Sequence, residues 1–152
     1  MGFLKAFGAT RRDITLSGNV SSTVYVYVPE ILRDISKGDK FTLECSKKPT
    51  RLTSTVTGTA WESARDGDIP VLYRGKPVGF LSDYRVCRAV RKVLDAGLGV
   101  RVAAVCKAEG KRRGWPTILA LTPSEEGIES QANKRLAELG MQPLPKGRTR
   151  TR

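Results

Sequence analysis

The chain has 152 residues with 27 Lys or Arg against 15 Asp or Glu, so its formal net charge is +12 at pH 7. This length suits one domain with a modest core and tails, and the charge favours a polyanionic partner such as nucleic acid. The lack of histidine excludes the commonest general base, and the three cysteines are too widely spaced for a zinc knuckle or a disulfide framework. We therefore expect a non-catalytic protein that carries no cofactor and no metal.

The sequence also lacks the features of secreted and membrane proteins. No apolar run is long enough to span a membrane, and the apolar start at residues 1–7 is too short for a signal peptide. Cys45, Cys87 and Cys106 each stand in an apolar alternation, which is typical of buried thiols in a reducing compartment. We expect a cytoplasmic protein with no membrane partner.

The first part of the chain predicts strands with one short helix among them. Apolar or β-branched residues alternate in the manner of strands at residues 14–20, 23–28, 41–45 and 53–59. A proline at the start of an apolar stretch predicts a short helix at 29–38. Tyr25 and Tyr27 share one face of the second strand, where they are either a stacking platform for bases or ordinary packing residues. Residues 61–67 are expected to form a polar loop that starts at Trp61.

The most clearly patterned stretch is a hairpin that runs into a helix. Ile69–Tyr73 and Pro77–Leu81 read as two strands around a short turn that contains Gly75. Ser82 then caps a helix that ends at Gly97. The core-facing side of this helix carries Val86, Cys87, Val90, Val93 and Leu94. The opposite side, either a solvated basic surface or a phosphate-binding one, carries Arg85, Arg88, Arg91 and Lys92.

A second hairpin is predicted from the alternating residues 100–107 and 118–121, which pair as antiparallel strands. Its tip, residues 108–116, carries Lys111, Arg112, Arg113 and Trp115. Cations on a glycine-flanked loop can approach a phosphate backbone closely, and a tryptophan can stack on a base. An ordinary polar turn is the alternative interpretation.

The C-terminal part of the chain predicts a helix and a tail. Ser124 caps a helix that ends at Gly140. Its narrow apolar stripe consists of Ile128, Ala132, Leu136 and Leu139. Residues 141–152 combine Pro and Gly with alternating cations and have nothing to bury, which predicts a disordered basic tail.

These elements predict a mainly β fold with helices. We expect a small, partly open β-barrel of the OB or SH3-like type, with a central helix after the hairpin and a C-terminal helix. The expected organisation is a barrel domain at 1–122, a helix at 123–140 and a tail at 141–152. Barrels of this kind commonly bind oligonucleotides, although a fold alone does not establish a function.

The central hairpin carries the residues Ile69, Val71, Gly75, Val78, Gly79, Phe80 and Leu81 at the spacing of a family motif. Together with the following helix, they resemble the HIRAN domain, a small β-barrel module that binds DNA. The resemblance implies that residues 1–122 form a HIRAN-like barrel. In the family, an upstream Asn-Pro-Tyr-Asp motif helps to hold the 3′ end of single-stranded DNA through its Tyr and Asp. The matching place reads Ser-Ala-Arg-Asp here, so the resemblance implies this role for Asp66 alone.

We predict a non-catalytic nucleic-acid-binding module for single-stranded DNA or DNA 3′ ends, with DNA preferred over RNA. The candidate site residues are Trp61, Asp66, Tyr73, Arg85, Arg88, Lys111, Arg112, Arg113 and Trp115. The alternative is a protein-interaction or assembly module of a phage or mobile element with a non-specific basic surface. An acidic loop with Glu62, Asp66 and Asp68 has the ligand chemistry of a divalent cation site, but hydrated loop charges are the default interpretation.

Overall fold

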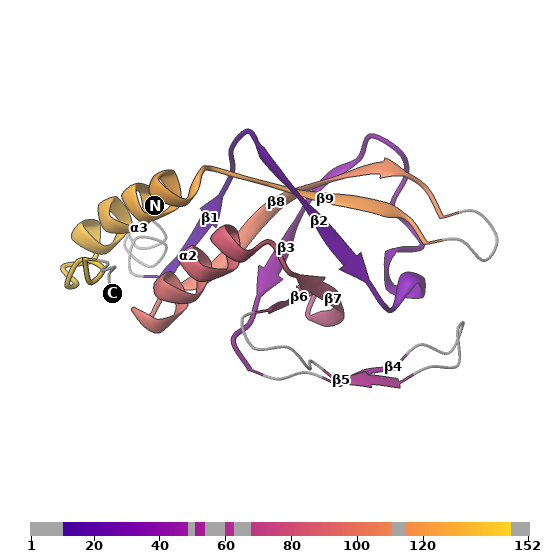
Figure 1. The fold of residues 1–152 in the computed structure, drawn as a ribbon, viewed down its shortest axis with the longest axis horizontal. Helices are drawn as coiled ribbons and strands as arrows, with labels where there is room; N and C mark the ends of the chain where they lie inside the picture. The colour runs from indigo at the N-terminus through magenta and orange to yellow at the C-terminus, as the bar shows by residue number, and fades with distance from the viewer. Residues whose placement is uncertain (1–10, 49–50, 54–59, 63–67, 111–114, 147–152) are drawn as a thin grey trace, which may run out of the picture.

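The computed structural model describes residues 11–48, 51–53, 60–62, 68–110 and 115–146, and for 51–53 and 60–62 the description covers the backbone. The strands are β1 (Asp13–Leu16), β2 (Val20–Val26), β3 (Lys40–Cys45), β4 (Arg51–Thr53), β5 (Ala60–Glu62), β6 (Ile69–Tyr73), β7 (Lys76–Leu81), β8 (Gly99–Ala108) and β9 (Thr117–Thr122). The helical elements are the 3-10 turn η1 (Pro29–Leu32) and the helices α2 (Tyr84–Asp95) and α3 (Glu125–Glu138) (Figure 1). Within these ranges, neither helix is long and apolar enough to cross a bilayer.

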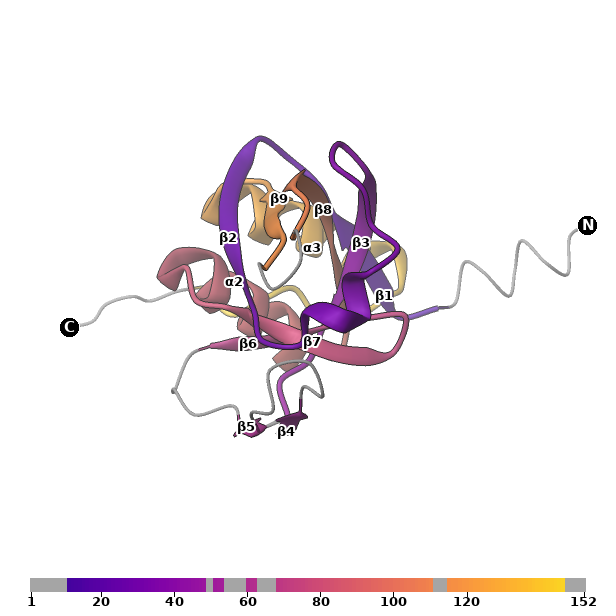
Figure 2. The same ribbon diagram turned by 90° about the vertical axis from the view of Figure 1, so that its right-hand side faces the viewer.

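Six antiparallel strands close into a barrel in the order β8-β3-β6-β7-β2-β9, because β9 also pairs with β8 (Figure 2). The predicted β-barrel fold is therefore confirmed, with a closed rather than a partly open barrel. β1 is an additional strand that pairs in parallel with the start of β8, from Gly99 to Val102. β9 takes over the same edge of β8 from Ala103 onward. The long β8 thus joins the barrel to its extra strand.

The predicted hairpin is present as β6 and β7. Arg74 and Gly75 form its two-residue turn with φ angles of 52° and 81°, the left-handed conformation that a type I′ hairpin turn requires at both positions. Tyr73 pairs with Lys76, so the second strand starts one residue earlier than predicted. Ile69, Val71, Val78 and Leu81 of this hairpin are fully buried in the core.

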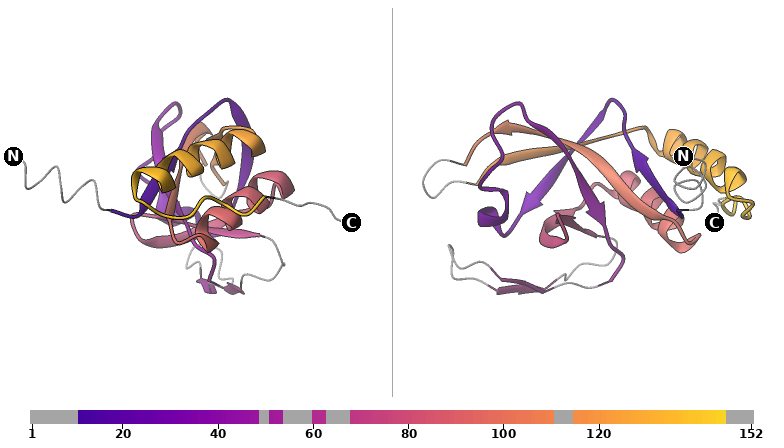
Figure 3. Two further views of the ribbon diagram at one scale, coloured as in Figure 1. Left: turned by 90° about the vertical axis from the view of Figure 1, so that its left-hand side faces the viewer. Right: turned by 180° about the vertical axis from the view of Figure 1, so that it is seen from behind.

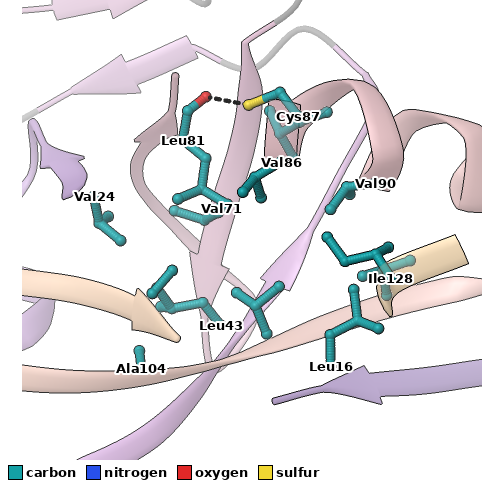
Figure 4. Packing of buried hydrophobic residues seen from close by; sticks show 14 of the residues in the cluster. Leu16, Val24, Leu43, Val71, Leu81, Val86, Cys87, Val90, Ala104 and Ile128 are labelled. Carbon is teal, nitrogen blue, oxygen red and sulfur yellow. Dashed lines mark hydrogen bonds between the residues drawn. The ribbon is translucent and has the colours of Figure 1, made fainter. Parts of the chain in front are cut away.

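The two helices lie side by side at one end of the barrel (Figure 3). The predicted N-cap of α2 at Ser82 is wrong: the carboxylate of Asp83 accepts a hydrogen bond from the Val86 backbone N–H at 3.1 Å. The predicted N-cap of α3 at Ser124 is confirmed, since its hydroxyl accepts from Gly127 N–H at 3.1 Å. The apolar faces of both helices enter the barrel core as predicted (Figure 4).

Two predictions in the first half of the chain, one of a strand and one of a loop, are wrong. The single strand expected at 14–20 is divided into β1 and β2, because the connection 17–19 bends beside Gly18, at Asn19. A side chain at Gly18 would overlap the backbone of Thr122 and Pro123, so this turn accepts only glycine. Trp61 lies in β5, paired with Leu52 of β4, and not at the start of a loop. Residues 54–59, the rest of the predicted polar strand, lie outside the described residues.

More of the C-terminal segment is packed against the core than its composition predicts. Leu144 is 5% exposed, and its backbone N–H donates a hydrogen bond to Asn133 Oδ1 at 2.7 Å. The side chain of Met141 also packs against the core. The prediction of a disordered tail from Met141 is therefore wrong for residues 141–146, because two apolar side chains in a Pro-rich segment suffice to hold it against α3. The last six residues lie outside the described part of the chain.

Candidate nucleic-acid interface

The outward-facing residues of β3, β8, β9 and β2 form a continuous surface on the barrel. Strand pairing aligns one row of side chains, Lys40, Val105, Leu119 and Thr23, and beside it a second row, Thr42, Ala103, Leu121 and Ser21. The next outward residues are Tyr25, Thr117 and Lys107. Successive strand residues point to opposite faces, so the side chains between these ones fill the barrel. We call this surface the outer barrel face; its middle is small, apolar or hydroxyl-bearing.

Two exposed aromatic rings lie at one end of the outer barrel face. Tyr25 is 51% exposed and Trp115, just before β9, is 48% exposed. Tyr27 behaves differently, because its ring packs edge-on against Phe80 with centroids 5.5 Å apart. Of the two roles open for the tyrosines, packing therefore applies to Tyr27, whereas Tyr25 presents its ring to solvent. An exposed ring of this kind is able to stack on a base.

Cations line the same end of this face. Lys40 begins β3 and Lys107 lies near the end of β8, and both are exposed. Within the described residues, neither lysine side chain forms an ion pair or a hydrogen bond. The nearby Glu109 carboxylate accepts a hydrogen bond from the Lys37 backbone N–H at 3.0 Å. The two ammonium groups are therefore available to an anionic ligand.

Several predicted site residues lie outside the described residues: Asp66, Lys111, Arg112 and Arg113. The three cations belong to the β8–β9 connection, of which the structure describes residues 109–110 and 115–116. For Trp61, the structure describes the backbone in β5. The described ends of the β8–β9 connection lie at the same end of the barrel as Tyr25, Lys40 and Lys107.

The cationic side of α2 lies elsewhere. Figure 1 shows α2 at the opposite end of the long axis from the described ends of the β8–β9 connection. Arg88 donates to Glu125 of α3, with its Nη2 2.6 Å from Oε2, and this contact raises the pKa of Arg88 above its ordinary value. Lys92 pairs with Glu129 at 3.0 Å. The helix that carries Arg85 and Arg88 therefore lies away from the described ends of the β8–β9 connection.

Tyr73 belongs to the core and not to the outer barrel face. It is 8% exposed, and its ring meets Phe41 edge-on with centroids 5.5 Å apart. The guanidinium of Arg74 lies 5.0 Å from the centre of the same ring. Because these neighbours cover the ring, the predicted role of Tyr73 in a binding site does not hold for this structure.

Two of the cysteine thiols are buried in the described part of the chain. Burial raises the pKa of the Cys87 thiol to about 12, so it stays protonated and weakly nucleophilic at neutral pH. Burial likewise raises the pKa of Cys106. Within the described ranges, no group of three or more Cys, Asp or Glu side chains is placed to hold a metal ion. In the acidic loop, Asp66 is not described, and the backbone carbonyl of Asp68 accepts a hydrogen bond from Arg91 at 3.1 Å.

The sequence did not predict that Lys40, Lys107 and the apolar rows belong to one surface. Lys40 faces Val105 across sixty-five positions of the chain, and only the strand register brings them together. The sequence shows which residues of each strand face outward, but it does not show the order of the strands around the barrel.

Comparisons of the chain with protein-family models, with curated proteins and with solved structures find no significant match.

Proposed function

We propose that this chain is a non-catalytic nucleic-acid-binding module that holds single strands on its outer barrel face. The observation that carries the proposal is the position of Tyr25 and Trp115, two exposed rings at the end of the barrel where Lys40 and Lys107 are unpaired within the described residues. The net charge of +12 adds a long-range attraction for polyanions.

The exposed rings and the lysines suit the base and the phosphate of a nucleotide, respectively. Stacking of a base on an aromatic ring contributes about 1–3 kcal/mol per base and requires no particular base. Lysines beside the rings neutralise phosphates and release counterions. Between them, Ala103, Val105, Leu119 and Leu121 of β8 and β9 offer a partly exposed apolar surface against which the sugars can pack. The barrel class is consistent with this use, since sheet faces of small barrels bind oligonucleotides in several unrelated proteins.

Single strands are favoured over duplexes. In a duplex the base faces are stacked on one another and are not available to Tyr25 or Trp115, whereas an unpaired strand exposes them. A duplex ligand would use the lysines alone and would bind with the weak, salt-dependent affinity of any basic surface. We propose DNA over RNA on the basis of the HIRAN resemblance.

Recognition of a 3′ end is the finer part of this proposal, and it rests on Asp66. Most of the other residues that carry the HIRAN resemblance are accounted for by the barrel itself: Ile69, Val71, Val78 and Leu81 are fully buried. A carboxylate repels a bound polyanion unless it accepts a hydrogen bond from a terminal 3′-hydroxyl. Asp66→Ala is therefore expected to improve binding to internal single strands and to impair binding to free 3′ ends.

The test is fluorescence anisotropy of the full chain with labelled oligonucleotides over a salt series. The set contains an oligo(dT) single strand, its RNA counterpart, a blunt duplex, and single strands that end in a 3′-hydroxyl or a 3′-phosphate. The proposal predicts tightest binding to single-stranded DNA and a steep loss of affinity with salt. Equal binding of single strand and duplex would leave only a basic surface. No binding at low salt would overturn the proposal.

A further inference from the structure

A groove runs along the outer side of α2, at the opposite end of the molecule from the described ends of the β8–β9 connection. Its first part is a hollow of about 400 Å³ lined by Tyr84, Arg88, Arg91, Lys92 and Asp95. The second part, about 530 Å³, shares Lys92 and Asp95 and continues over Ala96, Met141, Pro143 and Pro145. We call the two parts together the α2 groove. Along the helix, Tyr84 to Asp95 spans about 17 Å, the length of about five extended residues.

The second wall of this groove is held in place. The Met141 backbone N–H donates to the carbonyl of Leu136 at 2.8 Å, and the Leu144 N–H donates to Asn133 at 2.7 Å. The buried side chain of Leu144 anchors the segment to the core between the two prolines. The groove therefore exists before a ligand arrives, which lowers the entropy cost of binding.

Tyr84 supplies an anchor at the other end of the groove. It is 72% exposed, the most exposed of the large hydrophobic side chains in the described part of the chain. Arg88 lies 5.1 Å from the ring centre and donates to the tyrosine hydroxyl at 3.3 Å, while its other side is fixed by Glu125. An ordered, solvent-facing tyrosine beside an arginine has the composition of a protein-binding hot spot.

The charges of the groove select the partner. Arg88, Lys92 and Asp95 are each paired, with Glu125, Glu129 and Lys47 respectively. Arg91 lines the groove, and Arg85 lies beside it on α2, next to Tyr84. Neither has a carboxylate partner within the described residues, and Arg91 donates instead to the backbone carbonyl of Asp68. This excess of positive charge favours an acidic partner.

A peptide fits this chemistry better than a nucleic acid. A phosphate backbone would meet Glu125 and Glu129 beside the cations it needs, whereas a peptide can place isolated carboxylates near Arg85 and Arg91 and an apolar side chain against Met141 and Pro143. We infer that the α2 groove docks a short acidic segment of a partner protein, with an apolar or aromatic anchor.

The test is a selection of random seven-residue peptides displayed on phage against the full chain, with counter-selection against the Tyr84→Ala/Arg85→Glu variant. The consensus peptide is then synthesised and titrated by anisotropy. Tyr84→Ala and Arg85→Glu are each expected to weaken its binding about tenfold, as hot-spot substitutions do. Arg33→Glu is the matched control: it makes the same charge change at an exposed residue far from the groove, and it should leave binding unchanged.

The inference holds if the selected peptides are enriched in Asp or Glu around one apolar position and respond to the groove variants. It is overturned if no sequence is enriched, if the selected peptides bind the groove variants equally well, or if oligo(dT) displaces them, which would make the groove a polyanion site. Thermal melts establish that the variants are folded, and Tyr84→Phe, which keeps the ring, serves where Tyr84→Ala does not fold. The affinity of the same groove variants for oligo(dT) tests the outer barrel face separately from the α2 groove.

Discussion

Gly79 of β7 lies directly against the backbone of Tyr25 in β2, so closely that a Cβ at Gly79 would overlap the Tyr25 carbonyl oxygen. These residues belong to the pairing of β2 with β7, where Val26 is opposite Gly79 and Tyr25 is opposite Phe80. The closure of the barrel therefore depends on a residue without a side chain. The same contact fixes the strand that turns the Tyr25 ring outward, which links the stability of the barrel to the proposed site.

Gly79→Ala is expected to destabilise the protein by about 1–3 kcal/mol or more, because the new methyl group must push two paired strands apart. Chemical denaturation measures this loss. Gly99→Ala is the matched control in another strand, since its Cβ would meet Asp13 at an ordinary 3.5 Å. Equal free energies of unfolding for the two variants would contradict the close approach of β2 and β7.

Val90→Asp is expected to unfold the protein. Val90 is fully buried on α2, and a charge there has no partner and costs several kcal/mol. Arg85→Asp places the same carboxylate on the exposed side of the same helix and should leave the thermal transition nearly unchanged. A soluble, cooperatively melting Val90→Asp variant would show that the core side of α2 is assigned incorrectly.

Truncation after Gly140 and truncation after Lys146 are expected to differ in their effect on stability. Removal of every residue after Gly140 takes away Leu144 and should cost about 1.5–3 kcal/mol, the value of burying one such side chain. Removal of the residues after Lys146 should leave the melting temperature unchanged while it lowers non-specific affinity for nucleic acid, because it deletes cations. If both truncations melt like the parent, the packing of Leu144 does not contribute to stability.

Alkaline pH should destabilise the protein through its buried thiols. Burial raises the pKa of Cys87 from 9.0 to about 12 in the folded chain, so the unfolded chain loses this proton first. The contribution of the thiol is fully present below pH 9 and is lost as the pH rises towards 12. Cys87→Ala should therefore show a flatter fall of stability in this range than the parent, measured by denaturation at a series of pH values. A parallel fall in both proteins would rule out this role of Cys87.

The parts of the fold that were predictable from sequence are local. The β6–β7 hairpin follows from Gly75 and a period-2 pattern, and the core side of α2 follows from helical spacing, because both signals lie within a few residues. The cap at Asp83 was missed because Ser82 is an equally good capping residue one position earlier. Long-range facts, such as the burial of Tyr73 under Phe41, depend on the strand order and leave no local signal.

The candidate site was partly predictable for the same reason. Trp115 and its neighbouring cations stand together in the sequence, so one end of the site was visible. Lys40 comes from a distant strand and carries no motif, and only the pairing of β3 with β8 reveals its position. From sequence, Arg85 and Arg88 were grouped with the cations of the β8–β9 connection, because the sequence shows the charge of a residue but not its position in the fold.

The most direct test of single-strand binding on the outer barrel face is the salt dependence of oligo(dT) affinity in two matched variants. Lys40→Ala/Lys107→Ala should reduce the slope of log affinity against log salt by about 1.4, which is about 0.7 for each lost phosphate contact. Tyr25→Ala/Trp115→Ala should weaken binding by about 1–3 kcal/mol per lost stack and leave the slope almost unchanged. If both double variants bind oligo(dT) with the parental affinity and the parental slope, the outer barrel face is not where single strands bind.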